Sequence, residues 1–122
     1  MQKIVLDTNF LLIPGQFKID IFSEIDRICN FKYQLCVVDK TLDELESIVK
    51  KQKGKDKAAA KLALQLLKRK DLKILPTQAG IGVDESLIGL KGCIIATQDA
   101  ELKRKLGKSL IVMVGKKHLR LE

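Results

Sequence analysis

Five short, largely apolar segments recur along this chain, and amphipathic segments separate them. The apolar segments are 3–6, 34–38, 72–75, 93–96 and 110–114, and each has the length of a strand that is buried on both faces. The intervening segments repeat apolar residues at helical spacing, over 21–29, 42–49, 59–67, 84–90 and 100–106. This alternation predicts a three-layer α/β/α fold, in which helices cover both faces of a mostly parallel sheet.

Short sequence motifs predict the loops and helix starts between these segments. Pro14-Gly15 and the stretch 77–83 are expected to be loops, and Thr41-x-x-Glu44 has the form of a capping box. The segment 110–114 is the last clear strand, so the expected order is βαβααβαβαβ. With 122 residues, we expect a single domain over residues 1–122.

The apolar runs are too short to span a membrane. The longest covers five residues, at 110–114, whereas a transmembrane helix needs about 20. The first strand begins at residue 3, so we expect no signal peptide and a cytoplasmic location. Cys29, Cys36 and Cys93 each lie in an apolar segment, which is typical of buried, reduced thiols rather than of a zinc site.

Four acidic residues stand at strand ends or near helix starts: Asp7, Glu44, Asp84 and Asp99. In an open α/β sheet, ligands bind at the carboxyl ends of the strands. Carboxylates that converge there repel one another unless a cation joins them, and Mg²⁺ and Mn²⁺ prefer oxygen ligands. The four are therefore the candidate catalytic and metal-binding residues. Glu44 could instead complete the capping box, and Asp84 could be an ordinary N-cap.

Further polar residues flank these acids. Asn9 and Thr97 each lie two residues from an aspartate, so we expect them to hold a ligand or a metal-bound water from the second shell. Another four acids are expected to face solvent, although the sequence leaves open whether one of them joins the site; they are Asp43, Glu46, Glu85 and Glu101.

The net charge of +8 is concentrated in one segment. Residues 50–70 hold nine Lys or Arg and one acid, whereas the rest of the chain has 14 of each sign. Such a basic stripe is typical of a surface that binds phosphate backbones, and its alternative is a solvated helix face. The candidate RNA-binding residues are Lys57, Lys61 and Lys68 first, then Lys103, Arg104 and Lys105.

An acidic metal pocket in a basic protein favours hydrolysis of a polyanion, because divalent ions can activate water and neutralise the charge that develops on a phosphodiester. The sequence has no glycine-rich phosphate loop. Tyr33 is the only tyrosine and there is no tryptophan, so base stacking is not expected to dominate recognition. A phosphoacceptor domain is disfavoured, because it would need paired acids after the first strand and Asp7 is followed by Thr8.

Four motifs together resemble those of PIN-domain nucleases. IVLDTNFLL at 4–12 is similar to the opening signature of that family, and LDEL at 42–45, VDESLI at 83–88 and IATQDAEL at 95–102 are similar to its later acidic positions. The resemblance covers nearly the full chain in the right order. It implies a metal-dependent ribonuclease with single-stranded RNA as the usual substrate. The third motif departs from the usual pattern, because Val83 and Glu85 flank its acid.

The resemblance extends to a subgroup. The run DAELKRKL at 99–106 is more similar to PIN nucleases of small-subunit rRNA processing than to the toxins of toxin–antitoxin pairs. An endoribonuclease of rRNA processing is thus the first expectation. The alternatives are a toxin-type PIN ribonuclease and a catalytically silent RNA-binding or scaffold domain. The sequence leaves open the RNA that is cleaved, a homodimer, a protein partner or inhibitor, and whether one or two ions bind.

Overall fold

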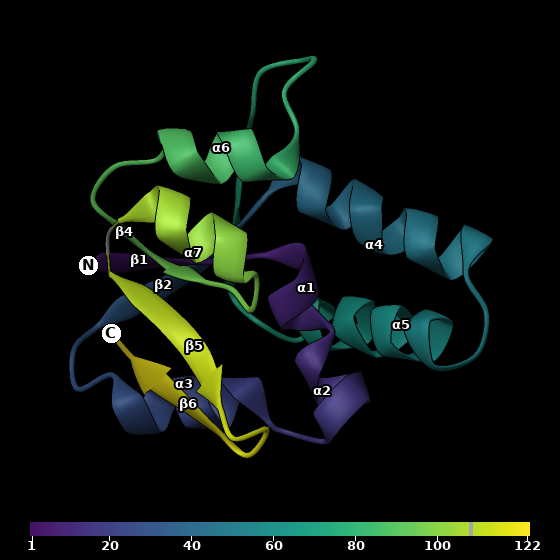
Figure 1. Ribbon diagram of the computed structural model, residues 1–122, viewed down its shortest axis with the longest axis horizontal. Helices are drawn as coiled ribbons and strands as arrows, with labels where there is room; N and C mark the ends of the chain where they lie inside the picture. Colours follow the sequence, from purple (N-terminus) through teal and green to yellow (C-terminus); the bar gives the residue numbers. More distant parts are fainter. Residues whose placement is uncertain (108) are drawn as a thin grey trace.

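A six-stranded sheet forms the centre of the molecule in the computed structural model, which describes residues 1–107 and 109–122 (Figure 1). The strand order is β3-β2-β1-β4-β5-β6, and every pairing is parallel except that of β5 with β6. The strands are β1 (Gln2–Leu6), β2 (Tyr33–Val38), β3 (Leu72–Leu75), β4 (Cys93–Ala96), β5 (Leu110–Val114) and β6 (His118–Leu121). The predicted fold class is confirmed.

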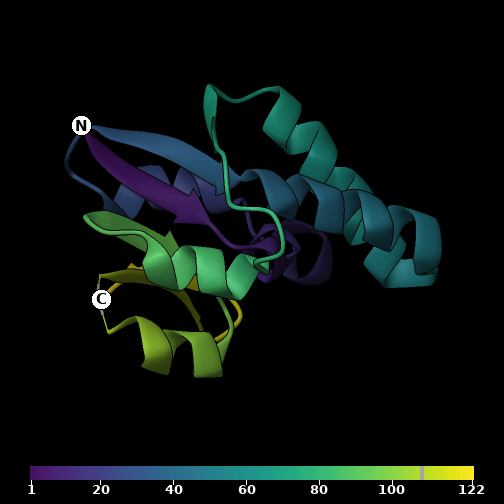
Figure 2. The same cartoon turned by 90° about the horizontal axis from the view of Figure 1, so that it is seen from above.

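Seven helices are described: α1 (Thr8–Leu11), α2 (Ile13–Phe17), α3 (Ile21–Ile28), α4 (Asp39–Lys51), α5 (Gly54–Lys68), α6 (Val83–Gly89) and α7 (Ala100–Leu106). They cover both faces of the sheet, as the two views show (Figures 1 and 2). Successive residues of a strand point to opposite faces. Ile4 and Leu6 therefore pack in the core under α1 to α5, whereas Val5 packs in the core under α6 and α7. None of these described helices is long and apolar enough to cross a membrane.

The expected loop at Pro14-Gly15 is wrong, because both residues belong to α2. Proline fits the first turn of a helix, where its missing N–H would have no partner within the helix. Gly15 lies against α5 so closely that a Cβ added to it would be 2.5 Å from the Cα of Ala59. The pair that suggested a turn therefore starts a helix and permits a close helix–helix contact.

Strand β6 was not predicted from the sequence. Its four residues alternate polar and apolar in the sequence, but the segment is short and only Leu119 is buried. A tight turn with positive φ at Gly115 and Lys116 returns the chain antiparallel to β5. On its other side, the Leu119 N–H donates to Glu24 Oε1 of α3 at 2.9 Å.

The expectation that the three cysteines are buried thiols is confirmed. All three cysteines are free and buried. Gly107 ends α7 in the left-handed conformation, with φ of 54°. Because β1, β2 and β4 are parallel neighbours, their carboxyl ends meet at one edge of the sheet. The first residues of α1 and α4, and the N-cap of α7, lie just beyond this edge.

Candidate active site

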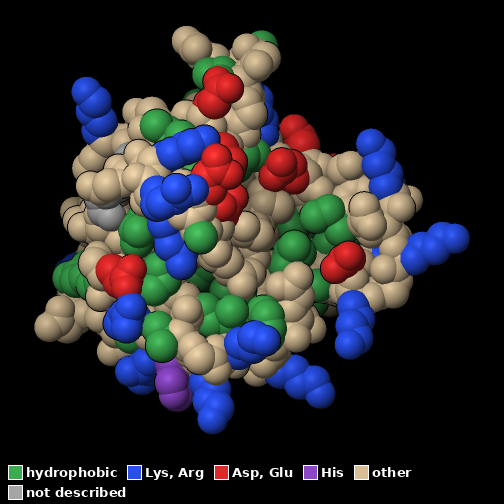
Figure 3. Space-filling model, viewed as in Figure 1, with side chains coloured by type: hydrophobic (Ala, Val, Ile, Leu, Met, Phe, Trp, Pro, Cys, Tyr) green, Lys and Arg blue, Asp and Glu red, His purple; other side chains and the backbone are tan. Residues whose placement is uncertain are grey.

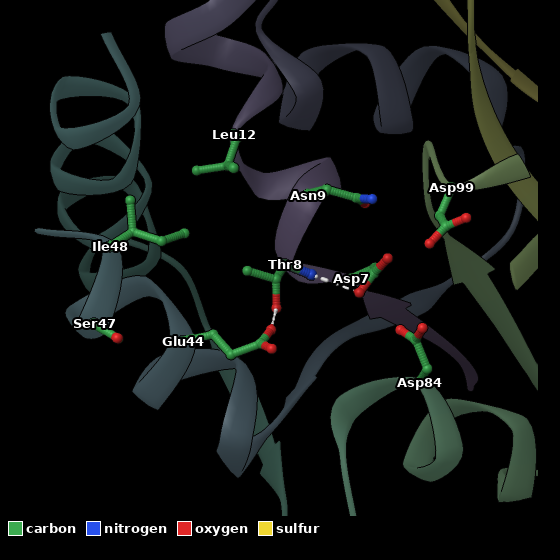
Figure 4. Close-up of a pocket in the computed structure, with 9 residues that line it drawn as sticks. All are labelled: Asp7, Thr8, Asn9, Leu12, Glu44, Ser47, Ile48, Asp84 and Asp99. Atoms are coloured by element: carbon green, nitrogen blue, oxygen red, sulfur yellow. Dashed lines mark hydrogen bonds between the residues drawn. The ribbon is translucent and has the colours of Figure 1, made fainter. Parts of the chain in front are cut away.

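All four candidate acids line a single pocket at this edge of the sheet (Figure 4). The pocket has a volume of about 400 Å³. Its lining residues are Asp7, Thr8, Asn9, Leu12, Glu44, Ser47, Ile48, Asp84 and Asp99. The sequence thus predicted which carboxylates meet, although their catalytic role stays a prediction.

Asp7 lies at the centre of this group. It directly follows β1, and its N–H donates to the carbonyl of Ala96 at 2.9 Å, which extends the pairing of β1 with β4. The residue is 4% exposed. One carboxylate oxygen accepts the N–H of Thr8 at 2.8 Å and caps α1, and the other accepts the hydroxyl of Thr97 at 2.7 Å. The carboxylate is therefore held rigidly from two elements.

The surroundings of Asp7 disfavour its ionised form. Burial raises the pKa of Asp7 to about 6, the bonds from Thr97 and Thr8 oppose that rise, and the nearby charges of Asp84 and Glu44 add to it. Proton affinity that is raised by burial and by like charges is typical of functional sites. A cation in this pocket would relieve both effects.

Glu44 faces the pocket and does not cap its helix, so the capping-box interpretation is wrong. Helix α4 begins at Asp39, directly after Val38, which places Thr41 inside the helix, where it is fully buried. Glu44 accepts a hydrogen bond from the hydroxyl of Thr8. Ser47 and Ile48 follow it at spacings of three and four, and so lie on the same helix face and extend the pocket wall.

Asp84 is not an N-cap either. Gly82 caps α6 without a side-chain hydrogen bond, and Asp84 lies in the first turn with its carboxylate turned toward Asp7 (Figure 4). Asp99, in contrast, does cap its helix: Oδ1 accepts the N–H groups of Glu101 at 3.0 Å and Leu102 at 3.2 Å. Because both bonds use Oδ1, the cap orients the carboxylate and leaves Oδ2 to the pocket.

The two predicted supporting residues lie beside these acids. Thr97 is fully buried; besides donating to Asp7, its hydroxyl oxygen accepts the N–H of Asp99 at 3.0 Å. Asn9 lines the pocket, and its backbone carbonyl accepts the side-chain N–H of Gln98 at 2.6 Å. Thr97 therefore joins two of the acids, and Gln98 holds Asn9 from the same turn.

Sequence reasoning missed the role of Thr8, the residue directly after Asp7. Its backbone N–H binds Asp7 and its hydroxyl binds Glu44, while a contact of 3.4 Å joins that hydroxyl to the one of Thr41. The helix period could have predicted Ser47 and Ile48 from Glu44. No local signal indicates Leu12.

Several other candidates lie outside the pocket. Asp43, Glu46, Glu85 and Glu101 are exposed and do not line it, and Glu101 pairs with Lys105 at 3.4 Å. The six candidate RNA-binding residues do not line it either.

The two groups of basic residues lie on different helices, and only one of these helices adjoins an acid of the pocket. Lys103, Arg104 and Lys105 belong to α7, the helix that Asp99 caps. Lys57, Lys61 and Lys68 belong to α5, which packs on α2 and α4. Figure 3 shows Lys and Arg side chains beside acidic ones over the region of α6 and α7, with further Lys and Arg around the α4–α5 turn.

The donor set suits an oxygen-preferring divalent ion. All four acids offer carboxylate oxygens, which Mg²⁺ and Mn²⁺ favour. Among the described residues, no three His, Cys, Asp or Glu side chains are close enough to ligate one ion as they stand.

Comparisons with known proteins identify the family. A family model described as a PIN like domain matches residues 4–120. Ribonuclease VapC4 of Methanocaldococcus jannaschii is 39% identical over 121 residues, which cover 93% of this chain and 90% of the relative. Ribonuclease VapC9 of Archaeoglobus fulgidus is 34% identical over 104 residues, which cover 83% and 73%. This chain therefore belongs to the PIN-like domain family.

Solved structures agree with the fold. The PIN domain endonuclease Utp24 aligns with a TM-score of 0.80 and 25% identity, over 98% of this chain and 90% of that structure. VapBC2 of Rickettsia felis, bound to a DNA fragment from its promoter, aligns with a TM-score of 0.62 and 15% identity, over 91% and 98%. At that identity the second likeness shows the fold alone.

The family predicted from the four motifs is thus confirmed, and the curated names agree with the expected class of enzyme, an endoribonuclease. The finer expectation of an rRNA-processing subgroup has less support than the toxin alternative, because these two curated relatives are VapC ribonucleases, although the likeness to Utp24 fits it in part. The run at 99–106 that suggests this subgroup comprises Asp99 and the whole of α7, of which Leu102 and Leu106 are buried.

Proposed function

We propose that this chain is a divalent-metal-dependent endoribonuclease and the toxin component of a toxin–antitoxin pair, acting as one domain in the cytoplasm. The observation that carries the proposal is the pocket in which the buried Asp7 faces Glu44, Asp84 and Asp99. The toxin role is supported by the two VapC relatives, whose matches cover 93% and 83% of the chain. Ribosomal RNA processing is the second candidate, and the fold likeness to Utp24 favours it.

The four carboxylates would hold Mg²⁺ or Mn²⁺. When bound there, such an ion supplies an activated water and neutralises charge on the scissile phosphate. The pocket suits this use because the cost of burying Asp7 in its ionised form, which raises its pKa to about 6, is offset by a nearby cation.

Two threonines hold the acids of the pocket in fixed positions. Thr97 and the backbone of Thr8 fix both oxygens of Asp7, and the Thr8 hydroxyl holds Glu44 on the opposite wall. Preorganised ligands lose little conformational freedom when an ion or a substrate arrives. Leu12 and Ile48 add an apolar wall to one side of the pocket.

Binding of RNA is proposed to rest on backbone charge. Phosphate groups that approach Asp99 pass α7, whose last turn carries Lys103, Arg104 and Lys105. These cations would offset repulsion between the RNA backbone and the acidic pocket. As a toxin, the chain would also bind a protein antitoxin, and a homodimer belongs to the same proposal.

Cleavage of single-stranded RNA by the purified chain tests the activity. We expect cleavage with Mn²⁺ or Mg²⁺, none with EDTA, and none by Glu44→Gln. The matched control is Glu46→Gln, which changes an exposed glutamate on the same helix outside the pocket and should cleave normally. A wild-type chain that binds RNA without cutting it in Mn²⁺ would instead establish the silent scaffold.

A growth assay distinguishes the toxin role from the role in ribosomal RNA processing. Induced expression of the wild-type chain should arrest growth of a host that lacks the antitoxin, and expression of Glu44→Gln should not. Normal growth, together with accumulation of correctly trimmed small-subunit rRNA, would favour the processing role.

A further inference from the structure

Two residues at the start of α4 hold the chain between β3 and α6. The Lys40 ammonium donates hydrogen bonds to the backbone carbonyls of Gln78 and Ile81. The Asp39 carboxylate accepts the hydroxyl of Thr77 at 2.6 Å and the N–H of the same residue at 3.3 Å. One helix turn therefore fixes this connection at both of its ends. We name this pair of residues the Asp39–Lys40 clamp.

The connection has few other restraints. Five of its seven residues, 76–82, are exposed, so burial of apolar surface contributes little to its position. Gly80 has a φ of 85°, a conformation that suits glycine and gives the backbone no stiffness of its own. Hydrogen bonds from a charged donor or to a charged acceptor are among the stronger ones in proteins. The clamp is therefore the main restraint on where the connection lies.

The clamp ties together the elements that carry two acids of the pocket. Asp84 lies in the first turn of α6, two residues after the connection ends, and no side chain caps that helix. Glu44 lies on α4, the same helix that supplies the clamp. A shift of the connection would move Asp84 relative to both Glu44 and Asp7 without disturbing the sheet.

We propose that Asp39 and Lys40 are positioning residues that set the place of Asp84 in the pocket, and through it the affinity of the pocket for a divalent ion. This inference rests on the proposed function, since it presumes that the pocket binds such an ion. An aspartate is ionised at neutral pH, and the hydrogen bond from the Thr77 hydroxyl lowers the pKa of Asp39 further, so the clamp keeps its charge there.

Titration of the purified full chain with Mn²⁺ in a calorimeter tests the proposal. Lys40→Met keeps the aliphatic stem and removes the ammonium. It should weaken Mn²⁺ binding by about tenfold, the lower end of what is lost when a residue that orients a metal ligand is removed. Thr77→Val should weaken it in the same direction. Lys40→Arg restores a cationic donor and should recover most of the affinity. The matched control is Lys50→Met, an exposed lysine on the same helix, which should bind Mn²⁺ within twofold of wild type.

A second measurement separates positioning from a general loss of structure. In EDTA, Lys40→Met should speed amide hydrogen exchange in α6 while exchange in β1 stays at the wild-type rate. Cleavage of RNA by Lys40→Met should also recover as Mn²⁺ is raised to saturation. If Lys40→Met does not fold, Thr77→Val decides, because it removes one hydroxyl and no charge.

The outcomes distinguish the two proposals. Wild-type Mn²⁺ affinity in both Lys40→Met and Thr77→Val, with unchanged exchange in α6, would overturn the positioning role and leave the nuclease intact. Equal Mn²⁺ binding by wild type and Asp7→Asn would show that the pocket holds no ion, and so would overturn the proposed function itself.

Discussion

The Thr97 hydroxyl donates a hydrogen bond of 2.7 Å to the buried carboxylate of Asp7, and joins the ends of two neighbouring parallel strands. The same oxygen accepts the N–H of Asp99. One side chain therefore organises two of the four acids. It also opposes the rise in the pKa of Asp7 that burial causes. The site thus depends on a residue that carries no charge.

Removing that hydroxyl should weaken both the fold and the site. Thr97→Val keeps the shape and leaves a buried carboxylate one partner short, which should cost about 1–3 kcal/mol of unfolding free energy. Urea denaturation in EDTA measures this cost. Thr97→Ser keeps the hydroxyl and should restore most of the stability and of the Mn²⁺ affinity. Equal stability of the Val and Ser variants would contradict the role given to this bond.

Stability without metal should fall as pH rises through the range in which Asp7 ionises. Its pKa is raised from 3.8 to about 6 in the folded state, so the folded chain binds this proton more tightly than the unfolded chain does. The unfolding free energy should then decrease between about pH 4 and pH 6, by at most about 3 kcal/mol, at roughly 1.4 kcal/mol per pKa unit.

The variant Asp7→Asn isolates this effect. Asparagine cannot ionise, so the unfolding free energy of this variant should not decrease between about pH 4 and pH 6. At pH 7 in EDTA the variant should be at least as stable as wild type. Adding Mn²⁺ should raise the melting temperature of wild type and leave that of Asp7→Asn unchanged. A wild-type profile that stays flat from pH 4 to pH 7 would show that burial of Asp7 has no such cost.

Two of the four acids were predictable because their signals are local. Asp7 follows a strand directly, and Asp99 follows another after two residues, so the parallel sheet alone brings them together. For Glu44 and Asp84, the sequence offered a capping role as well. A capping role for these two acids is excluded only by the positions at which α4 and α6 begin, Asp39 and Val83.

What the sequence could not predict depends on contacts between distant residues. Lys40 contacts carbonyls 38 and 41 positions away, and no local pattern encodes such a pairing. Strand β6 forms because β5 and Glu24 of α3 offer it partners, although its own sequence buries one leucine. The local sequence predicts a loop at Gly15, because the contact that requires a glycine there is made with Ala59, 44 residues further along the chain.

Glu24 should anchor β6 in a pH-dependent way. The side chain of Arg27 and the N–H of Leu119 bind its carboxylate, and the first of these bonds is the main cause that lowers its pKa to about 2. A lowered pKa means that the stabilisation is present above about pH 4.5 and is lost as pH falls toward 2. Glu24→Gln should cost about 1–2 kcal/mol at pH 7 and progressively less in acid.

Hydrogen exchange locates this effect. Glu24→Gln should speed exchange of the Leu119 amide at pH 7 more than that of amides in β1. The control is Asp26→Asn, an exposed change on the same helix, which should leave β6 unaffected. A cost that persists unchanged at pH 2.5 would rule out the carboxylate as its source.

Gly15→Ala should destabilise the chain through one close contact. The added Cβ would be 2.5 Å from the Cα of Ala59, and because that atom is backbone, α5 must move. We expect a cost of about 1–3 kcal/mol, typical of overpacking. Gly89→Ala is the control, since nothing lies within 4 Å of its added Cβ. Thermal unfolding of both variants measures the difference, and equal melting temperatures would mean that α2 and α5 are less closely packed.

The two basic groups should differ in their contribution to RNA binding. Asp99 of the pocket is the N-cap of α7, whereas Lys57, Lys61 and Lys68 lie on α5, which does not line the pocket. Each lysine or arginine that contacts single-stranded RNA adds about 0.7 to the slope of log affinity against log salt. Replacing Lys103, Arg104 and Lys105 with glutamine should therefore flatten the slope by about two units and weaken binding for every sequence.

The matching triple variant of Lys57, Lys61 and Lys68 removes the same charge from α5 and should change the slope less. Filter binding at several salt concentrations, with EDTA present to prevent cleavage, compares the two. Both inward faces stay intact, since Leu102 and Leu106 of α7 and Ala63 and Leu67 of α5 are unchanged, so both variants should fold. A larger change of slope for the α5 variant would place the RNA backbone along α5 instead, and equal wild-type slopes for both would exclude either helix as its path.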